Sequence, residues 1–177
     1  MSDRNIRKLV LAAVFAALCT ILTLVIQIPS PMHGYVNLGD CAVLLSAWVL
    51  GPGYGGAAAG IGSMLADLFS GYAYYAPGTF AIKLAMAAAA AYLFQILQRR
   101  THRTLLARAV SGAAAEAIMV AGYFAYACLW LGNGLAAAAS IPGNIVQGIF
   151  GLIAGAAVYS LLSRGRALPM LSGRHTS

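Results

Sequence analysis

Residues 40–69 read DCAVLLSAWVLGPGYGGAAAGIGSMLADLF. Two apolar segments, 40–50 and 55–69, flank a Gly-Pro-Gly turn sequence, and an aspartate stands near each outer end of the stretch. Asp40, Asp67 and the nearby Lys83 each cost several kcal/mol to bury among apolar groups unless they face a partner or a polar cavity. These three residues are therefore the first candidates for a functional site.

The composition excludes a soluble domain. The chain has 177 residues, of which 61% are hydrophobic and 8% are charged, and its mean hydropathy is +0.81. Its apolar runs are long enough to cross a bilayer as helices of about 20 residues. The sequence therefore indicates a multispan integral membrane protein with loops too short to fold separately.

Hydropathy and turn residues predict an all-α integral membrane bundle of six transmembrane helices in a single domain over residues 1–177. The predicted spans are 8–28, 40–50, 55–69, 79–97, 106–131 and 141–162. The second span is short for a full crossing, and residues 163–177 are expected to form a short basic cytoplasmic tail.

Positive charge alternates with loop parity. The basic residues cluster before the first span, between the fourth and fifth, and after the sixth: Arg4, Arg7, Lys8, Arg99, Arg100, Arg103, Arg108, Arg164, Arg166 and Arg174. Because cytoplasmic loops carry an excess of Lys and Arg, both termini are predicted to be cytoplasmic. This collar accounts for most of the net charge of +7 and favours contact with the lipid bilayer over nucleic-acid binding.

Polar and aromatic residues are predicted to meet in the outer half of the bundle. Counting depth at about 1.5 Å per residue places Asp40, Asp67 and Lys83 at a similar level. Asn144 and Gln147 reach the same layer on one helix face. The outward-facing pocket predicted for a small, polar, planar molecule consists of Tyr35, Asn37, Asp40, Asp67, Tyr74, Tyr75, Lys83, Tyr123, Asn144 and Gln147.

Each of these residues also has a purely structural interpretation. Asp67 and Lys83 could form an ion pair between helices, and Asp40 could cap its helix. The tyrosines could belong to an aromatic belt at the membrane interface. Glu116, near the middle of the fifth span, could make a packing hydrogen bond, stay protonated, or hold a coupling ion.

The sequence predicts neither a metal site nor a catalytic site. Cys19, Cys41 and Cys128 lack CxxC spacing, and the histidines are scattered. No cofactor is expected.

Small residues mark close helix packing. Ala12, Ala13, Ala16 and Ala17 form two overlapping AxxxA pairs in the first span. Two GxxxG pairs, Gly56 with Gly60 and Gly151 with Gly155, favour packing inside the chain.

A longer pattern runs through the first half of the chain. GYVNLGD at 34–40 continues through LGPGYGG at 50–56, GIGS at 60–63, ADL at 66–68, SGY at 70–72 and YAPGTF at 75–80 to Lys83. This pattern resembles the substrate-binding S component of energy-coupling factor (ECF) vitamin transporters. The similarity is greatest to the branch grouped with riboflavin, pyridoxine and hydroxymethylpyrimidine transport.

The resemblance implies a vitamin importer of the prokaryotic plasma membrane. An S component captures a vitamin from outside, closes its first extracellular loop, here 29–39, and docks on a membrane T component that carries two cytoplasmic ATPase subunits. Ala12, Ala13, Ala16 and Ala17 match the docking motif. The chain contains no GxxxxGK[ST] phosphate loop, which agrees with ATP hydrolysis on a partner.

The substrate stays open within this interpretation. Pyridoxine and hydroxymethylpyrimidine are favoured, and riboflavin, thiamin, pantothenate and queuosine are alternatives. A stand-alone proton-coupled carrier would use Asp40, Asp67 or Glu116, but the chain lacks the internal repeat typical of that class. An intramembrane enzyme built on Ser63 would lack a histidine within a span.

Overall fold

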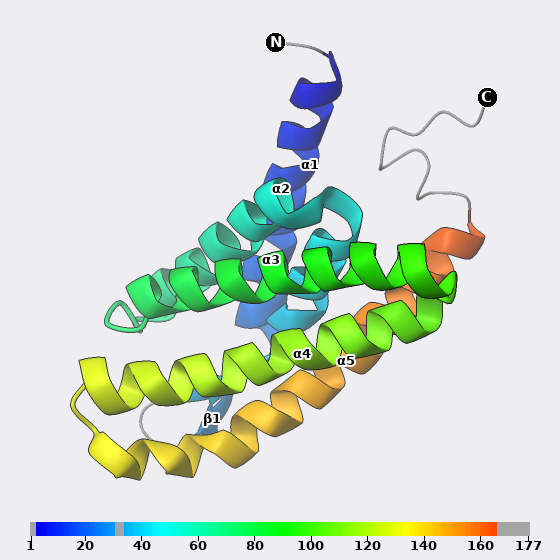
Figure 1. Cartoon of the computed structure of the whole chain (residues 1–177). Helices are drawn as coiled ribbons and strands as arrows, with labels where there is room; N and C mark the ends of the chain where they lie inside the picture. Colours follow the sequence, from blue (N-terminus) through cyan, green and yellow to red (C-terminus); the bar gives the residue numbers. More distant parts are fainter. Residues whose placement is uncertain (1–2, 31–33, 166–177) are drawn as a thin grey trace.

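The computed structural model of the protein describes residues 3–30 and 34–165, and these residues form a bundle of long helices (Figure 1). In chain order the elements are α1 (Asp3–Val25), β1 (Ile28–Ser30), β2 (Gly34–Val36), α2 (Gly39–Phe69), α3 (Ala76–Thr101), α4 (Thr104–Ala125), the π-helical turn η1 (Tyr126–Trp130), the 3-10 helix η2 (Gly134–Ser140) and α5 (Ile141–Arg164). Five helical segments in this part of the chain are long and apolar enough to cross a membrane. The protein is therefore a membrane-embedded helical bundle.

The prediction of six separate helices is not confirmed, because the spans 40–50 and 55–69 form the single element α2. One residue inside α2, Gly51, is not helical, with φ 80° and ψ −175°. This conformation is open essentially only to glycine. Pro52 follows it, where a helix that restarts tolerates a residue without an N–H group.

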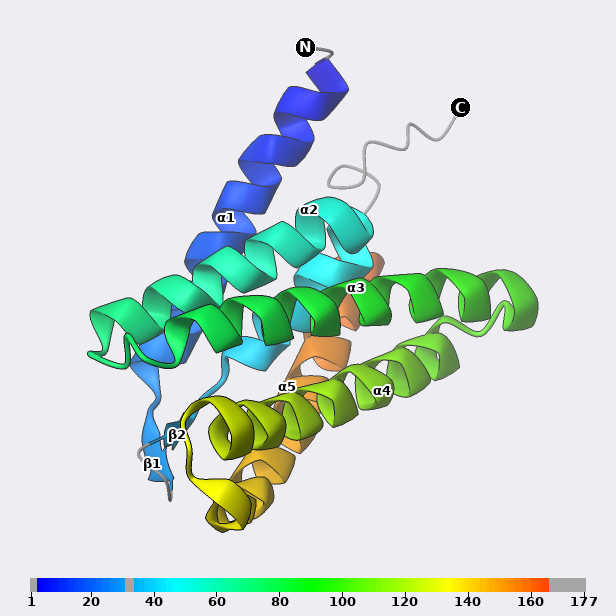
Figure 2. The ribbon, with the colours of Figure 1, turned by 60° about the vertical axis from the view of Figure 1, so that its left-hand side comes forward.

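At Gly51 the chain folds back on itself. A straight helix separates residues nine apart by about 13.5 Å, yet the Ser46 hydroxyl donates a hydrogen bond of 3.1 Å to the carbonyl oxygen of Gly55. Figures 1 and 2 show the two parts of α2 running in different directions. The reversal returns Asp67, near the end of α2, to the end of the bundle where Asp40 begins it.

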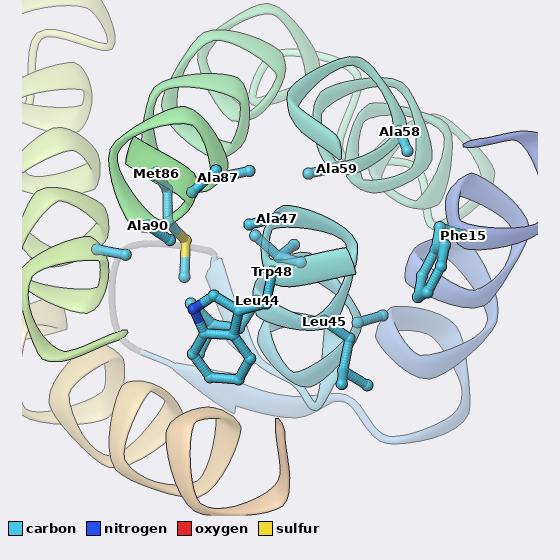
Figure 3. Packing of buried hydrophobic residues seen from close by; sticks show 14 of the residues in the cluster. Phe15, Leu44, Leu45, Ala47, Trp48, Ala58, Ala59, Met86, Ala87 and Ala90 are labelled. Atoms are coloured by element: carbon cyan, nitrogen blue, oxygen red, sulfur yellow. The ribbon is translucent and has the colours of Figure 1, made fainter. Parts of the chain in front are cut away.

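The core consists of the first part of α2 surrounded by the other helices. Figure 3 shows Leu44 and Trp48 of α2 facing Met86 of α3, with small alanines between the helices. Trp48 also donates a hydrogen bond of 3.1 Å from its indole nitrogen to the Ser111 hydroxyl of α4. Small residues allow this close approach, because burial from lipid adds no hydrophobic driving force.

Both GxxxG pairs pack inside the chain, as predicted. A β-carbon on Gly60 would lie 3.0 Å from the ring and the carbonyl of Phe80 on α3. A β-carbon on Gly151 would lie 2.6 Å from the β-carbon of Asp40, and one on Gly155 would lie 3.4 Å from the Cys41 carbonyl. These glycines bring α3 and α5 against α2.

The first extracellular loop predicted at 29–39 contains a short antiparallel hairpin, which was not predicted from the sequence. β1 pairs with β2 through Ile28–Val36, Pro29–Tyr35 and Ser30–Gly34. Figure 2 shows this hairpin near the connection between α4 and α5. The segment 31–33 of that loop and residues 166–177 of the predicted tail lie outside the described residues, and residues 163 and 164 of the tail belong to α5.

The turn at Gly51 provides a test of the fold. We expect Gly51→Ala to destabilise the protein by about 1–3 kcal/mol, because a β-carbon strains this backbone conformation. Gly53→Ala is the matched control: a β-carbon on Gly53 would have no neighbouring atom within 4 Å, and alanine there should be neutral or slightly stabilising. Denaturant-induced unfolding in micelles measures both, and equal stabilities of the two variants would contradict the assigned turn.

Candidate functional site

A polar cavity lies at the end of the bundle where α2 begins and ends. Its lining comes from α1, the 35–37 segment, α2, the turn before α3, α3, α4, η2 and α5: Thr23, Tyr35, Asn37, Ser63, Asp67, Tyr75, Thr79, Lys83, Tyr123, Ser140, Asn144 and Gln147. Of the ten residues predicted to form a pocket, all but Asp40 and Tyr74 line this cavity. Its free volume is about 50 Å³.

The floor of the cavity holds a buried ion pair. The Lys83 ammonium group on α3 pairs with Oδ1 of Asp40 on α2, and the two side chains are 3% and 0% exposed. The Gln147 amide on α5 donates a hydrogen bond of 2.7 Å to Oδ2 of the same carboxylate. Asp40 therefore lies behind the cavity lining and fixes two lining residues, Lys83 and Gln147, in place.

Two structural interpretations of these residues are wrong. Lys83 pairs with Asp40, so it does not form the considered ion pair with Asp67. Asp40 does not cap α2: Leu38 occupies the cap position and its side chain makes no capping hydrogen bond. The charge of Lys83 draws Asp40 into the interior instead.

The segment before α2 is fixed to α5 through the same network. The Asn37 backbone N–H and side-chain amide donate hydrogen bonds of 2.9 and 3.2 Å to the side-chain oxygen Oε1 of Gln147. The side-chain oxygen Oδ1 of Asn37 in turn accepts a hydrogen bond of 2.8 Å from the backbone N–H of Gly39. Gln147 therefore uses both ends of its amide, one toward Asp40 and the other toward Asn37.

Asp67 forms a separate part of the lining. Its Oδ1 accepts a hydrogen bond of 2.6 Å from the Tyr35 hydroxyl, and its Oδ2 has no hydrogen-bond partner among the described residues. Burial and the adjacent Asp67 carboxylate raise the pKa of Tyr35. Tyr35 thus stays a neutral donor at physiological pH and fixes the hairpin to the end of α2.

Aromatic rings form another wall. Tyr123 on α4 donates a hydrogen bond of 3.1 Å to the Thr79 hydroxyl, and its ring centre lies 5.5 Å from the Lys83 ammonium nitrogen. Tyr75 contacts the Tyr123 ring, with ring centres 6.4 Å apart. Tyr74 contacts Tyr75 but is 46% exposed and does not line the cavity.

Four hydroxyl residues of the lining were not predicted from the sequence: Thr23, Ser63, Thr79 and Ser140. Two of them could have been found from their spacing in the sequence. Ser63 precedes Asp67 by four residues and Thr79 precedes Lys83 by four, so each shares a helix face with a residue already singled out. Thr23 and Ser140 had no comparable signal.

Glu116 lies outside this cavity. Both of its carboxyl oxygens are buried without a hydrogen-bond partner among the described residues, so the packing hydrogen bond considered for it is not found there. It lines a second, mostly apolar cavity of about 230 Å³ between α4 and α5. Residues 3–30 and 34–165 contain no cluster of three His, Cys, Asp or Glu that could hold a metal ion.

The chain is similar to known proteins in sequence and in fold. Residues 3–164 match the family described as ECF-type riboflavin transporter, S component. An uncharacterised protein in the gap 3′ region of Pyrococcus woesei is 34% identical over 146 residues, which cover 82% of this chain and 94% of that protein. A solved S component of a bacterial ECF transporter has the same fold, with a TM-score of 0.69 at 20% identity over 90% of this chain and 97% of the other.

The ion pair provides a test of this geometry. We expect Lys83→Met to destabilise the protein by about 3–5 kcal/mol, because it leaves the Asp40 carboxylate buried without its cation. The double variant Asp40→Asn/Lys83→Met should recover most of that loss, since no charge is left unpaired. Unfolding in micelles without added vitamin measures the cycle, and additive effects of the two substitutions would show that the side chains do not interact.

Proposed function

Because the chain belongs to the family of S components of ECF-type riboflavin transporters, we propose that it binds a small water-soluble vitamin in the cavity around Lys83 and delivers it for ATP-driven import. The observation that carries the proposal is the gathering of polar and aromatic side chains from six helical elements, the 35–37 segment and the turn before α3 into one cavity of an otherwise apolar protein. An S component binds substrate and is not itself an enzyme.

The cavity chemistry supports a ring-shaped ligand. Tyr75 and Tyr123 offer aromatic faces, while Asn144, Gln147 and the hydroxyls offer hydrogen bonds in fixed directions. The free volume of about 50 Å³ is well below the roughly 300 Å³ or more of typical ligand pockets. A vitamin can therefore enter only if part of the lining moves. The parts of the lining outside the helices are the 35–37 segment and Tyr75, in the turn before α3, and the 35–37 segment, with two lining residues, is the larger of them.

The position of the cavity supports capture from outside the cell. Lys83 and Asn144 lie near the starts of α3 and α5, whereas Arg99, Arg100 and Arg164 lie in the last turns of those helices. The positive-inside rule places the basic ends in the cytoplasm of a prokaryotic cell. The cavity then faces outward, and both termini are cytoplasmic.

Two substrate assignments are supported by different observations. The tyrosine, amide and acidic residues suit a pyridine, pyrimidine or flavin ring, and the resemblance of the sequence pattern favours pyridoxine (vitamin B6) or hydroxymethylpyrimidine. The name of the matching family favours riboflavin. Native mass spectrometry of the protein purified without added vitamin distinguishes them, because tight binders retain their ligand.

The proposed partners are a membrane T component and two cytoplasmic ATPase subunits. The four alanines of the docking motif expected on α1 lie on two different faces of the helix. Ala12 is 8% exposed and packs in the core, and Ala16 lies against α2, where the Thr20 hydroxyl donates hydrogen bonds to the carbonyl oxygens of both Ala16 and Gly62. Ala13 and Ala17 are exposed, and we propose that they form the docking face.

Binding is tested at Asn144. Once the retained vitamin is identified, we expect Asn144→Ala to weaken its binding by about 1–3 kcal/mol, because a buried hydrogen bond is lost. Asn133→Ala removes the same side chain in the turn between η1 and η2, outside the cavity lining, and should bind normally. Titration calorimetry measures both, and wild-type affinity of Asn144→Ala would remove this residue from the proposed site.

Docking is tested on α1. Ala13→Leu/Ala17→Leu should abolish co-purification with the T component and uptake, because bulky side chains hold the helices apart, while vitamin binding persists. Ala81→Leu/Ala85→Leu adds the same bulk to an exposed AxxxA pair on α3 and should have no effect on assembly. Ala12→Leu should instead overpack the core and destabilise the protein by about 1–3 kcal/mol.

Normal assembly and uptake by Ala13→Leu/Ala17→Leu would contradict the docking face. Uptake by wild-type protein without any ATPase module would contradict the importer and favour a stand-alone carrier.

A further inference from the structure

Acidic residues outnumber basic residues around the cavity. Three of the four acidic residues of the chain, Asp40, Asp67 and Glu116, lie in or next to it. Glu116 approaches Asp40 across Gly151, since a β-carbon on that glycine would lie 2.6 Å from the Asp40 β-carbon and 3.4 Å from a Glu116 carboxyl oxygen. Within the described lining, Lys83 is the one basic residue.

The charge of Lys83 is already neutralised. Its ammonium group pairs with Asp40, a side chain that is completely buried and held on its other oxygen by Gln147. An anionic ligand would have to compete with this fixed carboxylate for the ammonium group. It would also meet the negative charge of Asp67, so the cavity offers an anion no net attraction.

Asp67 and Ser63 supply unused hydrogen-bonding capacity on the same wall. Oδ2 of Asp67 and the hydroxyl of Ser63 are buried and have no partner among the described residues. The two residues are four apart on α2, so they share one helix face. Unsatisfied buried polar atoms carry a free-energy cost that a ligand can remove by donating a hydrogen bond.

Movement of the 35–37 segment would increase this capacity. Oδ1 of Asp67 is occupied by the Tyr35 hydroxyl, and Tyr35 belongs to the 35–37 segment, whose movement would open the cavity. When Tyr35 leaves, the carboxylate presents both oxygens to the ligand.

We infer that Asp67 determines the specificity of this cavity: it selects a vitamin that is uncharged or cationic and presents a hydroxyl, ring N–H or ammonium donor, and the cavity rejects carboxylate and phosphate ligands. The inference rests on the proposed function. It narrows the candidate substrates by excluding pantothenate, which carries a carboxylate, while pyridoxine, hydroxymethylpyrimidine, thiamin and riboflavin satisfy it.

The test uses ligands that share a ring and differ in charge. The purified wild-type protein is titrated with pyridoxamine, pyridoxine and 4-pyridoxate, then with riboflavin and riboflavin 5′-phosphate, and also with hydroxymethylpyrimidine, thiamin, pantothenate and biotin. We expect at least one uncharged or cationic vitamin to bind. Where its anionic counterpart is in the panel, we expect that counterpart to bind on the order of a hundredfold more weakly or not at all.

Two variants assign the selectivity to Asp67. Asp67→Asn should weaken binding of the preferred ligand by about tenfold or more. It should also reduce the ratio of that ligand's affinity to the affinity of its anionic counterpart. Where the panel holds no such counterpart, pantothenate and biotin serve as the anionic ligands. Asp67→Glu keeps the charge and should keep the preference for uncharged or cationic ligands. An unchanged advantage in Asp67→Asn would overturn the assignment to this residue, and the wild-type comparison stands even if a variant fails to fold.

The failures of the two proposals are distinguishable. Binding of pantothenate, biotin, 4-pyridoxate or the riboflavin phosphate as tightly as any uncharged or cationic ligand would overturn the inference and leave the vitamin-binding function intact. If no vitamin in the panel binds and native mass spectrometry finds no retained ligand, both proposals are overturned.

Discussion

The ion pair between Lys83 and Asp40 determines how the rest of the polar interior is arranged. Neither charge can remain alone in an apolar bundle, because an unpaired buried charge costs several kcal/mol. The pair joins α3 to the start of α2, and the Gln147 hydrogen bond adds α5 to it. Because Gln147 also accepts hydrogen bonds from Asn37, the same network fixes the entrance segment. The cavity is formed around these contacts.

The reversal at Gly51 makes that network possible. Residues 39–50 are too few to cross a hydrocarbon core of about 30 Å as a helix. The turn at Gly51 reverses the direction of the chain, so the second part of α2 runs back to the end of the bundle where the first part began. Asp40 and Asp67 then lie at one end of the bundle, although 27 positions separate them in the sequence. Close packing of the two parts depends on small residues, since a β-carbon on Gly55 would lie 2.5 Å from the Ser46 carbonyl oxygen.

Hydropathy predicted α1, α3, α4 and α5 with boundaries displaced by a few residues, because long apolar runs have few alternative structures in a membrane. The counting of helical depth also brought together most of the cavity lining. It could not tell which acid pairs with Lys83, since Asp40 and Asp67 lie at the same depth and the choice depends on how α2 folds back. The hairpin was missed because three residues in each strand are too few for an alternating pattern to show. The rotation of α1 about its axis could not be predicted from the sequence either. Ala12 and Ala13 are chemically identical, and the contact of α1 with Gly62 determines which of them is buried.

The two contacts at the entrance differ in kind from the ion pair beneath them. Tyr35 with Asp67 and Asn37 with Gln147 are hydrogen bonds of a neutral donor, each with a net value of about 1 kcal/mol or somewhat more where the acceptor is charged. Breaking them leaves acceptors that a ligand hydroxyl or N–H group can satisfy in their place. Breaking the Lys83–Asp40 pair would instead leave two buried charges, at several times that cost. The energetics therefore favour movement of the 35–37 segment while the Lys83–Asp40 pair stays in place. Asp67 would exchange its hydrogen bond with Tyr35 for one with the ligand, so the same residue takes part in opening the cavity and in recognising the ligand.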